Sequence, residues 1–594
     1  MSGGPHSTSS GASGASAASA TNDDAYAGDR ALLRRFEPVL QLHNDELFLP
    51  AAVDDYVVAC SLRMHTDRGV ETLVPVGGLT IDNLADAEGG RQNVFLQFVD
   101  EHERRSHRRI RIRKHNHGAA RLSRVGFFGR IFDVLFRLSL VLRQTVPAGV
   151  TAAAAVKAKD LGMHRRPVYY GRVVRDGGWT VLHYQFFYAM NDWRSTFSGV
   201  NDHEADWEQI MVFVEEVDGE ASPHWVAYSN HDHSGDDLRR AWDDPELIRV
   251  GEHPVAWVGG GSHAHYFRPG QYTTRVKSSA FDRVRRWTNR GRRLLRIETL
   301  PEGLGIPYVD HADGRGNSIG PMQSMEWECR LLDPWPEWAA DFRGLWGLDT
   351  ADRTGGERAP SGPRFERDGS IRRSWMDPLG YAGLHKVAPP SQADAIRTRR
   401  LDALEIEASA LHARLESARL RLRAGELVGG LAPAASTALE EELERYREQD
   451  AGLRAERRRL QVGRRPATDL RAHLQHVPIP DRPTWSLRSR LLNTWVTISV
   501  PMLFMLAGLV IPLHRYIGFW ALIIVVAMVA VEAVLRQQVI SFVKVLVAIA
   551  VVVGVIGIAV YFAVRDWRWT LMAVLAGTGV LVLAANLKER FTSQ

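Results

Sequence analysis

The sequence predicts an all-β sandwich with helical insertions, followed by an α-helical coiled-coil hairpin and a C-terminal region of four transmembrane helices. Three observations lead to this fold class: short aromatic-rich runs between glycines and aspartates at 31–386, leucines at alternating three- and four-residue steps at 391–465, and long apolar runs at 488–590. A chain of 594 residues is long enough for these three parts.

Residues 1–30 are rich in serine, glycine and alanine, and they lack the apolar segment that a signal peptide contains. We therefore expect a disordered tail. Cys60 and Cys329 are far apart and match no zinc-ligand spacing. They indicate free thiols in a reducing compartment rather than a disulfide.

The net charge of +5 is modest for this length and does not by itself predict a nucleic-acid partner. The densest positive run, 102–117, has two interpretations. It could lie on anionic lipid head groups, or it could form an exposed strand, since RIRIR alternates with a period of two and arginine at a sheet edge discourages aggregation. No aromatic residues for base stacking lie nearby, so no nucleic acid is expected.

A β-hairpin is predicted where Asp176-Gly177-Gly178 separates two β-rich runs, because glycine adopts the positive φ angles of a tight turn. Further strands are expected around 210–214, 225–229 and 255–258. These strands would form much of the β-rich part.

An amphipathic helix is predicted at 126–145, where charged residues recur at near-helical spacing in apolar sequence. The charged residues are Arg130, Asp133, Arg137 and Arg143. They exclude a membrane span. The helix can pack in a protein core, or it can dock on a bilayer and insert Phe127, Phe128, Phe132 and Phe136.

The predicted coiled coil at 391–465 begins with an a/d seam. The seam residues are Leu401, Leu404, Ala408, Leu411, Leu415, Ala418 and Leu422. The sequence GELVGGLAPAAS interrupts the pattern, and Thr437 with Glu440 offers a capping box for a second helix. We expect a helical hairpin that pairs with itself or, as a homo-oligomer, with another subunit.

Four apolar runs are each long enough to cross the hydrocarbon of a bilayer. They are Leu491–Leu513, Tyr516–Leu535, Ile540–Val564 and Trp569–Leu587. Glu532 and Lys544 lie toward the ends of their runs, where their side chains can extend to the interface, so no charge at mid-depth marks a transport path. The runs are expected to anchor an integral membrane protein, in a plasma (inner) membrane with the main domain facing the cytoplasm.

Carboxylates and histidines gather around the sequence DHEADWEQI. If a strand begins here, Asp206 and Glu208 point to one face and Trp207 to the other, so both carboxylates can meet one cation. Together with His203 and Asp192 they form a set that suits Mg²⁺, Ca²⁺ or Mn²⁺ and admits Zn²⁺. The alternative is that the two carboxylates pair with nearby arginines.

Histidines recur at the ends of the strands that follow. They are His231, His233, His253, His263 and His265. A lone histidine is usually structural, whereas several that converge are candidates for ligands or acid/base groups. We assign His231 and His263 as candidate catalytic residues. The triple glycine at 259–261 matches no phosphate loop and is expected to allow close backbone approach before Ser262.

Three segments resemble, in order and spacing, the motifs of the vacuolar protein sorting 62 family. They are HEADWEQIMVFV, AYSNHDHSGD and HPVAWVGGGSHAHYF, where the family has H-E-G-D-W-E, Y-S-x-H and H-P-V…G-S-H-A-x-Y. Ala205 takes the place of the family's usual glycine. RFEPVLQLHNDELFLP and FRGLWG are similar to the family's borders, so the resemblance covers roughly 31–386. It implies a β-rich sandwich whose biochemical activity is poorly defined.

A more distant similarity is to the necrosis- and ethylene-inducing-like cytolysins, whose heptapeptide G-H-R-H-D-W-E binds a divalent cation with help from an upstream aspartate. The resemblance implies metal ligands at Asp192, His203, Asp206 and Glu208. It also matches His231 to a further functional histidine. The segment Asp202–Ala205 departs from the heptapeptide outside His203, and the gap after the upstream aspartate is longer.

The sequence leads to three hypotheses of function. The first is a membrane-anchored module that binds a divalent cation and through it a polar or anionic ligand, such as a lipid head group or a glycan. The second is a metal-dependent hydrolase of phosphoesters or other esters, in which the cation lowers the pKa of bound water and His231 or His263 moves protons. The third is an oligomeric pore-forming or structural assembly built from the hairpin and the spans.

Overall fold

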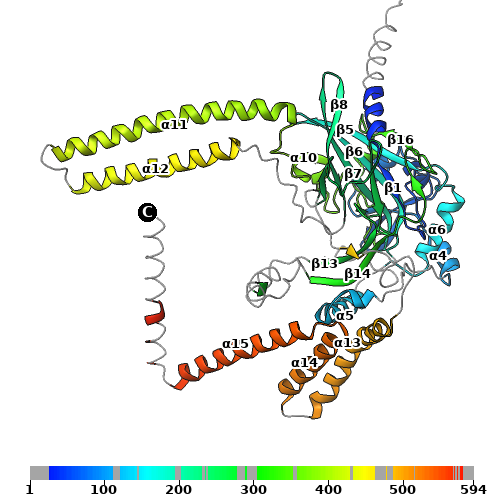
Figure 1. The fold of residues 1–594 in the computed structure, drawn as a ribbon. Helices are drawn as coiled ribbons and strands as arrows, with labels where there is room; N and C mark the ends of the chain where they lie inside the picture. The colour runs from blue at the N-terminus through cyan, green and yellow to red at the C-terminus, as the bar shows by residue number, and fades with distance from the viewer. Residues whose placement is uncertain are drawn as a thin grey trace, which may run out of the picture. The chain divides into compact units, whose positions relative to one another are not determined.

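The computed structural model describes residues 26–594 with gaps. The gaps are 111–120, 143–145, 194–201, 231–234, 236–237, 277–287, 290–303, 352–357, 428–432, 462–475, 478–485, 514–515, 566–567, 569–571, 573–574 and 579–594. The chain divides into two compact units, which are described separately (Figure 1). Unit 1 comprises Met1–His117, Arg137–Thr274 and Tyr308–Asp481, and unit 2 comprises Gly118–Phe136, Arg275–Pro307 and Arg482–Gln594.

The largest sheet of unit 1 has six strands in the order β16–β5–β6–β7–β8–β9. Their bounds are Glu328–Leu331 (β16), Val168–Asp176 (β5), Trp179–Asn191 (β6), His203–Val217 (β7), Glu220–Tyr228 (β8) and Arg239–Ala241 (β9). The predicted hairpin joins β5 to β6: Asp176 pairs with Trp179, and Gly177 and Gly178 have φ angles of 57° and 82°. The strands predicted around 210–214 and 225–229 fall in β7 and β8.

The second sheet of unit 1 has the order β10–β11–β1–β15, and β12 pairs with β11. The bounds are Arg249–Val250 (β10), His253–Val258 (β11), Val39–Gln41 (β1), Ser318–Ile319 (β15) and His265–Tyr266 (β12). Side chains from both sheets form one apolar core, in which Leu40 and Ala256 join Tyr184, Phe186 and Val212. The β-rich part therefore contains two sheets that share a core.

Two three-stranded sheets and short helices accompany the large sheets. The sheets are β3–β2–β4, with bounds Gly69–Val74, Ser61–Thr66 and Val94–Gln97, and β14–β13–β17, with bounds Leu304–Ala312, Gly270–Val276 and His476–Val477. The helices are α2 (Val53–Val58), α3 (Leu84–Glu88), α6 (Val150–Asp160), α8 (Glu337–Ala340), α9 (Arg373–Met376) and α10 (Pro378–Tyr381). The chain has both sheets and helices, so an all-β description fits only its large sheets. Cys60 and Cys329 are buried free thiols, as expected.

Two expectations for the N-terminal part differ from the structure. Residues 26–36 form a helix, so regular structure begins inside the expected tail at 1–30, and residues 1–25 lie outside the described part. The start of the basic run is also helical, because Asp100 and Glu103 form a capping box for α4 (Glu101–His107). Most of the RIRIR alternation falls in the gap at 111–120.

Helices α11 (Pro390–Leu427) and α12 (Pro433–Gln461) form the predicted helical hairpin and lie side by side (Figure 1). The buried core of the hairpin consists of Leu411, Leu415, Ala418 and Leu443. Helix α12 begins before the predicted start at Thr437. Assembly of the hairpin with a second subunit stays a prediction.

Unit 2 contains the C-terminal helices α13 (Leu487–Leu513), α14 (Ile517–Leu535) and α15 (Val539–Arg565). Two stretches, Leu487–Leu509 and Gly518–Leu535, are long and apolar enough to cross a membrane, and the apolar stretch Val539–Val555 is shorter. Most of the fourth predicted span, Trp569–Leu587, lies outside the described residues. Within the described part, the chain therefore has two candidate spans where four were predicted.

Helix α5 (Phe127–Leu142) is the predicted amphipathic helix. One face of its unit 2 part packs on α13 and α14, where Phe127, Val500 and Met528 are buried together. Glu532 is also buried, in an ion pair with Arg130. The carboxylate of Glu532 is therefore held inside the helix bundle, and the expectation that it extends to the interface was wrong.

Candidate functional site

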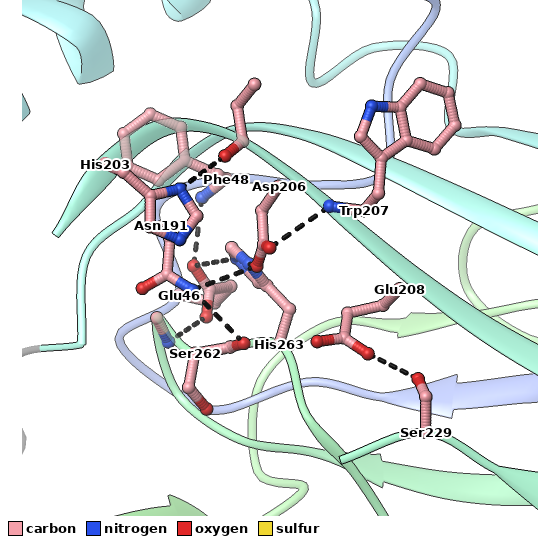
Figure 2. Close-up of polar contacts among 12 residues, drawn as sticks. Glu46, Phe48, Asn191, His203, Asp206, Trp207, Glu208, Ser229, Ser262 and His263 are labelled. Carbon is pink, nitrogen blue, oxygen red and sulfur yellow. Dashed lines mark hydrogen bonds and ion pairs between the residues drawn. The ribbon is translucent and has the colours of Figure 1, made fainter. Parts of the chain in front are cut away.

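The two predicted carboxylates lie on one face of β7, in the middle of the large sheet. Asp206 pairs with Tyr188 of β6, and Glu208 pairs with Phe186. Figure 2 shows both carboxylates on the same side of the strand and the ring of Trp207 on the other side. Trp207 joins a cluster of aromatic rings. The alternation of the strand thus separates a polar face from an apolar one, as predicted.

Asp206 is buried, and both oxygens of its carboxylate accept hydrogen bonds (Figure 2). Its Oδ2 accepts one from Nδ2 of Asn191 at 3.0 Å and one from Nδ1 of His263 at 2.9 Å. Its Oδ1 accepts one from the backbone N–H of Trp207 at 3.1 Å. A histidine is therefore a charge partner of Asp206, where the sequence suggested a metal ion or an arginine.

His263 is fully buried between two carboxylates. Its Nδ1 donates to Asp206, its Nε2 lies 3.6 Å from Oε1 of Glu46, and its ring stacks on Tyr188 with centroids 3.7 Å apart. Burial lowers the pKa of His263, but the hydrogen bonds and charges of Asp206 and Glu46 outweigh burial and raise it to about 10. His263 is therefore an imidazolium at neutral pH, which suits it poorly to the predicted proton transfer.

Glu46 belongs to this site, and sequence reasoning missed it. Its Oε1 accepts from the backbone N–H groups of Leu47 and Phe48 at 2.8 and 3.1 Å, and its Oε2 accepts from Gly261 at 2.8 Å. Gly261 has a φ of 71°, and a Cβ there would lie 2.3 Å from the backbone oxygen of Asp192. The triple glycine thus allows close backbone approach, as predicted. The available signal for Glu46 was the polar HNDE between the apolar runs VLQL and LFLP.

The other predicted ligands have different partners. Nδ1 of His203 donates to the carbonyl oxygen of Ala205 at 2.7 Å, and burial lowers the pKa of His203 to about 4. Glu208 accepts a hydrogen bond from the hydroxyl of Ser229. Asp192 is buried beside the triple glycine. His203 and Glu208 therefore have protein partners of their own.

The predicted ligands do not fit a metal site in the part of the chain that the structure describes. Among those residues, no group of three or more histidine, cysteine, aspartate or glutamate side chains is arranged to hold a metal ion. The imidazolium of His263 supplies the positive charge that burial of Asp206 and Glu46 requires. His231, the second candidate catalytic residue, and His233 lie outside the described residues. A divalent cation stays a prediction from the sequence.

Glu204 is turned toward a different part of the chain. Ala205 has a φ of 59°, which interrupts the alternation of β7. The Glu204 carboxylate accepts hydrogen bonds at 2.8–3.0 Å from three backbone N–H groups, those of Phe98, Val99 and Leu348. Burial raises the pKa of Glu204 to about 6, although these hydrogen bonds lower it. Glu204 therefore joins three segments of the fold.

A pocket of about 240 Å³ lies next to Glu208. It is lined by Trp207, Glu208, Gln209, Ser229, Asn230, Glu366, Arg372, Arg373, Ser374 and Tyr381. Arg372 lies 3.6 Å from Glu366 in an ion pair, and Arg373 donates to the carbonyl oxygen of Gly380 at 2.6 Å. The pocket thus combines two guanidinium groups with several hydrogen-bonding side chains.

No family model and no curated protein matches this chain. Weakly similar solved structures include NLPPya in complex with mannosamine, at 16% identity and a TM-score of 0.14, over 17% of this chain and 44% of that one. They also include the non-toxic HaNLP3 protein, at 20% identity and a TM-score of 0.13, over 15% of this chain and 39% of that one. A third is Necrosis and Ethylene inducing Protein 2 from the causal agent of witches' broom disease of cocoa. Its identity to this chain is 20% and its TM-score 0.15, over 17% of this chain and 46% of that one. The chain spans less than half the length of each, and the resemblance to the vacuolar protein sorting 62 family stays a prediction.

Proposed function

We propose that the protein is a membrane-anchored module whose β-rich unit binds a hydroxylated, anionic ligand, such as a lipid head group or an acidic glycan. The pocket beside Glu208 carries this proposal. Arg372 and Arg373 supply charge for an anionic group, since guanidinium groups bind phosphate and carboxylate through two parallel contacts. Glu208, Ser229 and Asn230 supply acceptors and donors for hydroxyl groups.

The size and the remaining lining of the pocket agree with a small ligand of this kind. Its volume of about 240 Å³ is below the range for drug-sized ligands and suits one sugar ring or head group. Tyr381 adds aromatic surface against which a ring can pack. A divalent cation is not needed in this proposal, because His263 already compensates Asp206 and Glu46.

Helices α13 and α14 would anchor the module, since each contains a stretch that is long and apolar enough to cross a bilayer. The location proposed for the β-rich unit is the cytoplasmic side of a plasma (inner) membrane. A ligand carried by a membrane lipid is the form of the proposal that this anchoring favours.

Calorimetric titration of the full chain in detergent micelles tests the pocket. The probes are inositol 1-phosphate and mannose 6-phosphate, with inositol and mannose as uncharged counterparts. We expect at least one phosphorylated probe to bind more tightly than its counterpart. Replacing both guanidinium groups, in Arg372→Gln/Arg373→Gln, should weaken that binding by roughly tenfold or more, because charge-assisted hydrogen bonds are lost.

The matched control is Arg399→Gln/Arg400→Gln, which changes two consecutive arginines of α11 outside the pocket. This variant should bind as the wild type does. Equal weakening in both double variants, or no binding of any phosphorylated probe, would contradict the proposal. EDTA should leave binding unchanged, and loss of binding in EDTA would favour the cation-mediated hypothesis instead.

A further inference from the structure

Helix α5 is too short to be a span, yet it packs on the candidate spans. At 1.5 Å per residue its 16 residues measure roughly 24 Å, less than the ~30 Å of bilayer hydrocarbon. On one face, Phe127, Ile131 and Val134 pack with residues of α13 and α14 that include Trp495 and Met528. The helix is therefore the third member of a bundle in unit 2.

A buried ion cluster fixes α5 on the helix pair. Both terminal nitrogens of Arg130 donate to the carboxylate of Glu532 on α14, Nη1 at 3.0 Å, and Nη2 also donates to the hydroxyl of Ser499 on α13 at 3.1 Å. Arg536 pairs with Glu532 at 2.8 Å and donates to two carbonyl oxygens just before α5. A buried charge that loses its partner reduces the stability of the fold by several kcal/mol. The cluster therefore determines which face of α5 packs on α13 and α14.

This orientation leaves an apolar stripe of α5 exposed. Phe128 and Leu135 are 59% and 50% exposed, and Phe132 between them is 40% exposed. The spacing of four and three residues places the three side chains on one face of the helix. Two aromatic rings and a leucine on one short exposed face are typical of helices that lie in a membrane interface.

The depth of the ion cluster follows from its position along the spans. Ser499 and Glu532 are 14 and 15 residues from the joined ends of α13 and α14, which is roughly 21–23 Å. With that joint at one boundary of the hydrocarbon, the cluster lies roughly 7–9 Å inside the other boundary. Near the same level, Ile498 and Val534 are exposed. The candidate spans therefore also expose apolar side chains near this level.

We propose that α5 lies in the interfacial layer of the bilayer that α13 and α14 cross, with Phe128, Phe132 and Leu135 among the acyl chains. This inference rests on the membrane anchoring proposed above. Lipid is favoured as the occupant because α5 packs directly on the two candidate spans, whose own apolar surface requires acyl chains. Residues 121–136, which lie far from the spans in sequence, would then be held at the membrane surface.

Nitroxide labels on the full chain in liposomes test this arrangement. Labels are placed at Phe128→Cys and Leu135→Cys, at Phe519→Cys on α14 as the span control, and at Val70→Cys on β3 as the aqueous control. Phe519 and Val70 are 59% and 44% exposed. Cys60 and Cys329 are buried, and wild-type chain measures their background labelling. Collision rates with oxygen, which concentrates in lipid, and with a water-soluble nickel chelate are then compared.

We expect the oxygen-to-nickel ratio at positions 128 and 135 to be several-fold above the ratio at position 70. Ratios at 128 and 135 that match position 70, with 519 still in lipid, would overturn the inference and leave the anchoring intact. If position 519 also matches position 70, the anchoring itself fails. Low collision rates with both reagents at 128 and 135 would mean that protein covers the stripe, which also overturns the inference.

Discussion

Each unit contains a buried ion cluster that joins distant parts of the chain. In unit 1, His263 lies between the carboxylates of Asp206 and Glu46. In unit 2, the carboxylate of Glu532 lies between Arg130 and Arg536. The first cluster is a cation between two anions and the second is an anion between two cations.

The two clusters differ in how permanent their charge is. A guanidinium keeps its proton throughout the pH range in which proteins fold, whereas an imidazolium can lose it. The cluster of unit 1 is charged at neutral pH because Asp206 and Glu46 raise the pKa of His263 to about 10 against the effect of burial. The positive charge of the contact is therefore conditional on pH in the β-rich unit and permanent in the helical unit.

The largest effect is expected from His263→Phe. Phenylalanine can keep the stacking on Tyr188, but two buried carboxylates lose their cation, which should reduce the free energy of unfolding by about 3–5 kcal/mol. Tryptophan fluorescence during denaturant unfolding measures the change. The matched control is His265→Phe, since burial lowers the pKa of His265 to about 3 and keeps it neutral. This control should reduce the free energy of unfolding by only about 1–2 kcal/mol, because it removes one hydrogen bond of a neutral ring.

Adding Asp206→Asn to His263→Phe removes one of the uncompensated charges and should restore part of the lost stability. Equal losses in His263→Phe and His265→Phe would contradict the assignment of His263 as an imidazolium.

A smaller loss is expected from Arg130→Met, in the permanent cluster. Glu532 keeps Arg536 as a partner, so the free energy of unfolding should fall by about 3 kcal/mol, the lower end of the range for a broken buried ion pair. Thermal loss of helical circular dichroism in detergent micelles measures it. The double variant Arg130→Met/Glu532→Met should be more stable than Arg130→Met, because no buried carboxylate is left with an incomplete set of partners. A double variant that is less stable than either single variant would contradict this account.

A pH series separates the two clusters. The pKa of His263 is about 10 in the folded chain against 6.5 ordinarily, so its stabilisation is complete below pH 6.5 and is lost as the pH rises through 10. Melting followed by tryptophan fluorescence should occur at lower temperature as the pH rises from 7 to 10, and His263→Phe should weaken this dependence. Arg130→Met should leave this pH dependence unchanged.

Two other buried histidines act in a different pH range. His203 and His265 have pKa values that burial lowers, so they affect stability below pH 6.5. A flat wild-type profile between pH 7 and 10 would count against the imidazolium.

The smallest effect is expected at an exposed ion pair. Arg400 of α11 pairs with Glu456 of α12 at 3.0 Å, and both side chains are in contact with water. Since water screens such a pair, Arg400→Gln should leave the melting temperature of the hairpin within experimental error. A loss as large as that of Arg130→Met would mean that burial does not decide the strength of ion pairs in this chain.

The sequence predicted features that depend on neighbouring residues. The alternation of β7 placed Asp206 and Glu208 on one face, because side chains of a strand alternate with a period of two. The two glycines after Asp176 predicted the hairpin between β5 and β6, because their positive φ angles are a property of the turn itself. The leucine seam predicted the hairpin of α11 and α12, because apolar residues at three- and four-residue steps lie on one face of a helix.

Prediction was weaker where a partner comes from a distant segment. Arg130 and Glu532 are 402 positions apart, and no periodicity indicates their contact. Glu46 was missed for the same reason, and without Glu46 the charge state of His263 could not be predicted. One local feature was also not predicted: the basic run begins with the helix α4, which the capping box of Asp100 and Glu103 starts, whereas most of RIRIR lies outside the described residues.

The packing of α5 on the C-terminal helices has a consequence for biosynthesis. Leu487, at the start of α13, lies 345 positions after Leu142, at the end of α5. At 5–20 residues per second, roughly 17–70 s of translation pass between the two helices. During this time Phe127 and Arg130 have none of their partners on α13 and α14, whereas a bilayer surface is present from the beginning. In the arrangement proposed for α5, the nascent chain therefore meets lipid through Phe128 before the ion cluster can form.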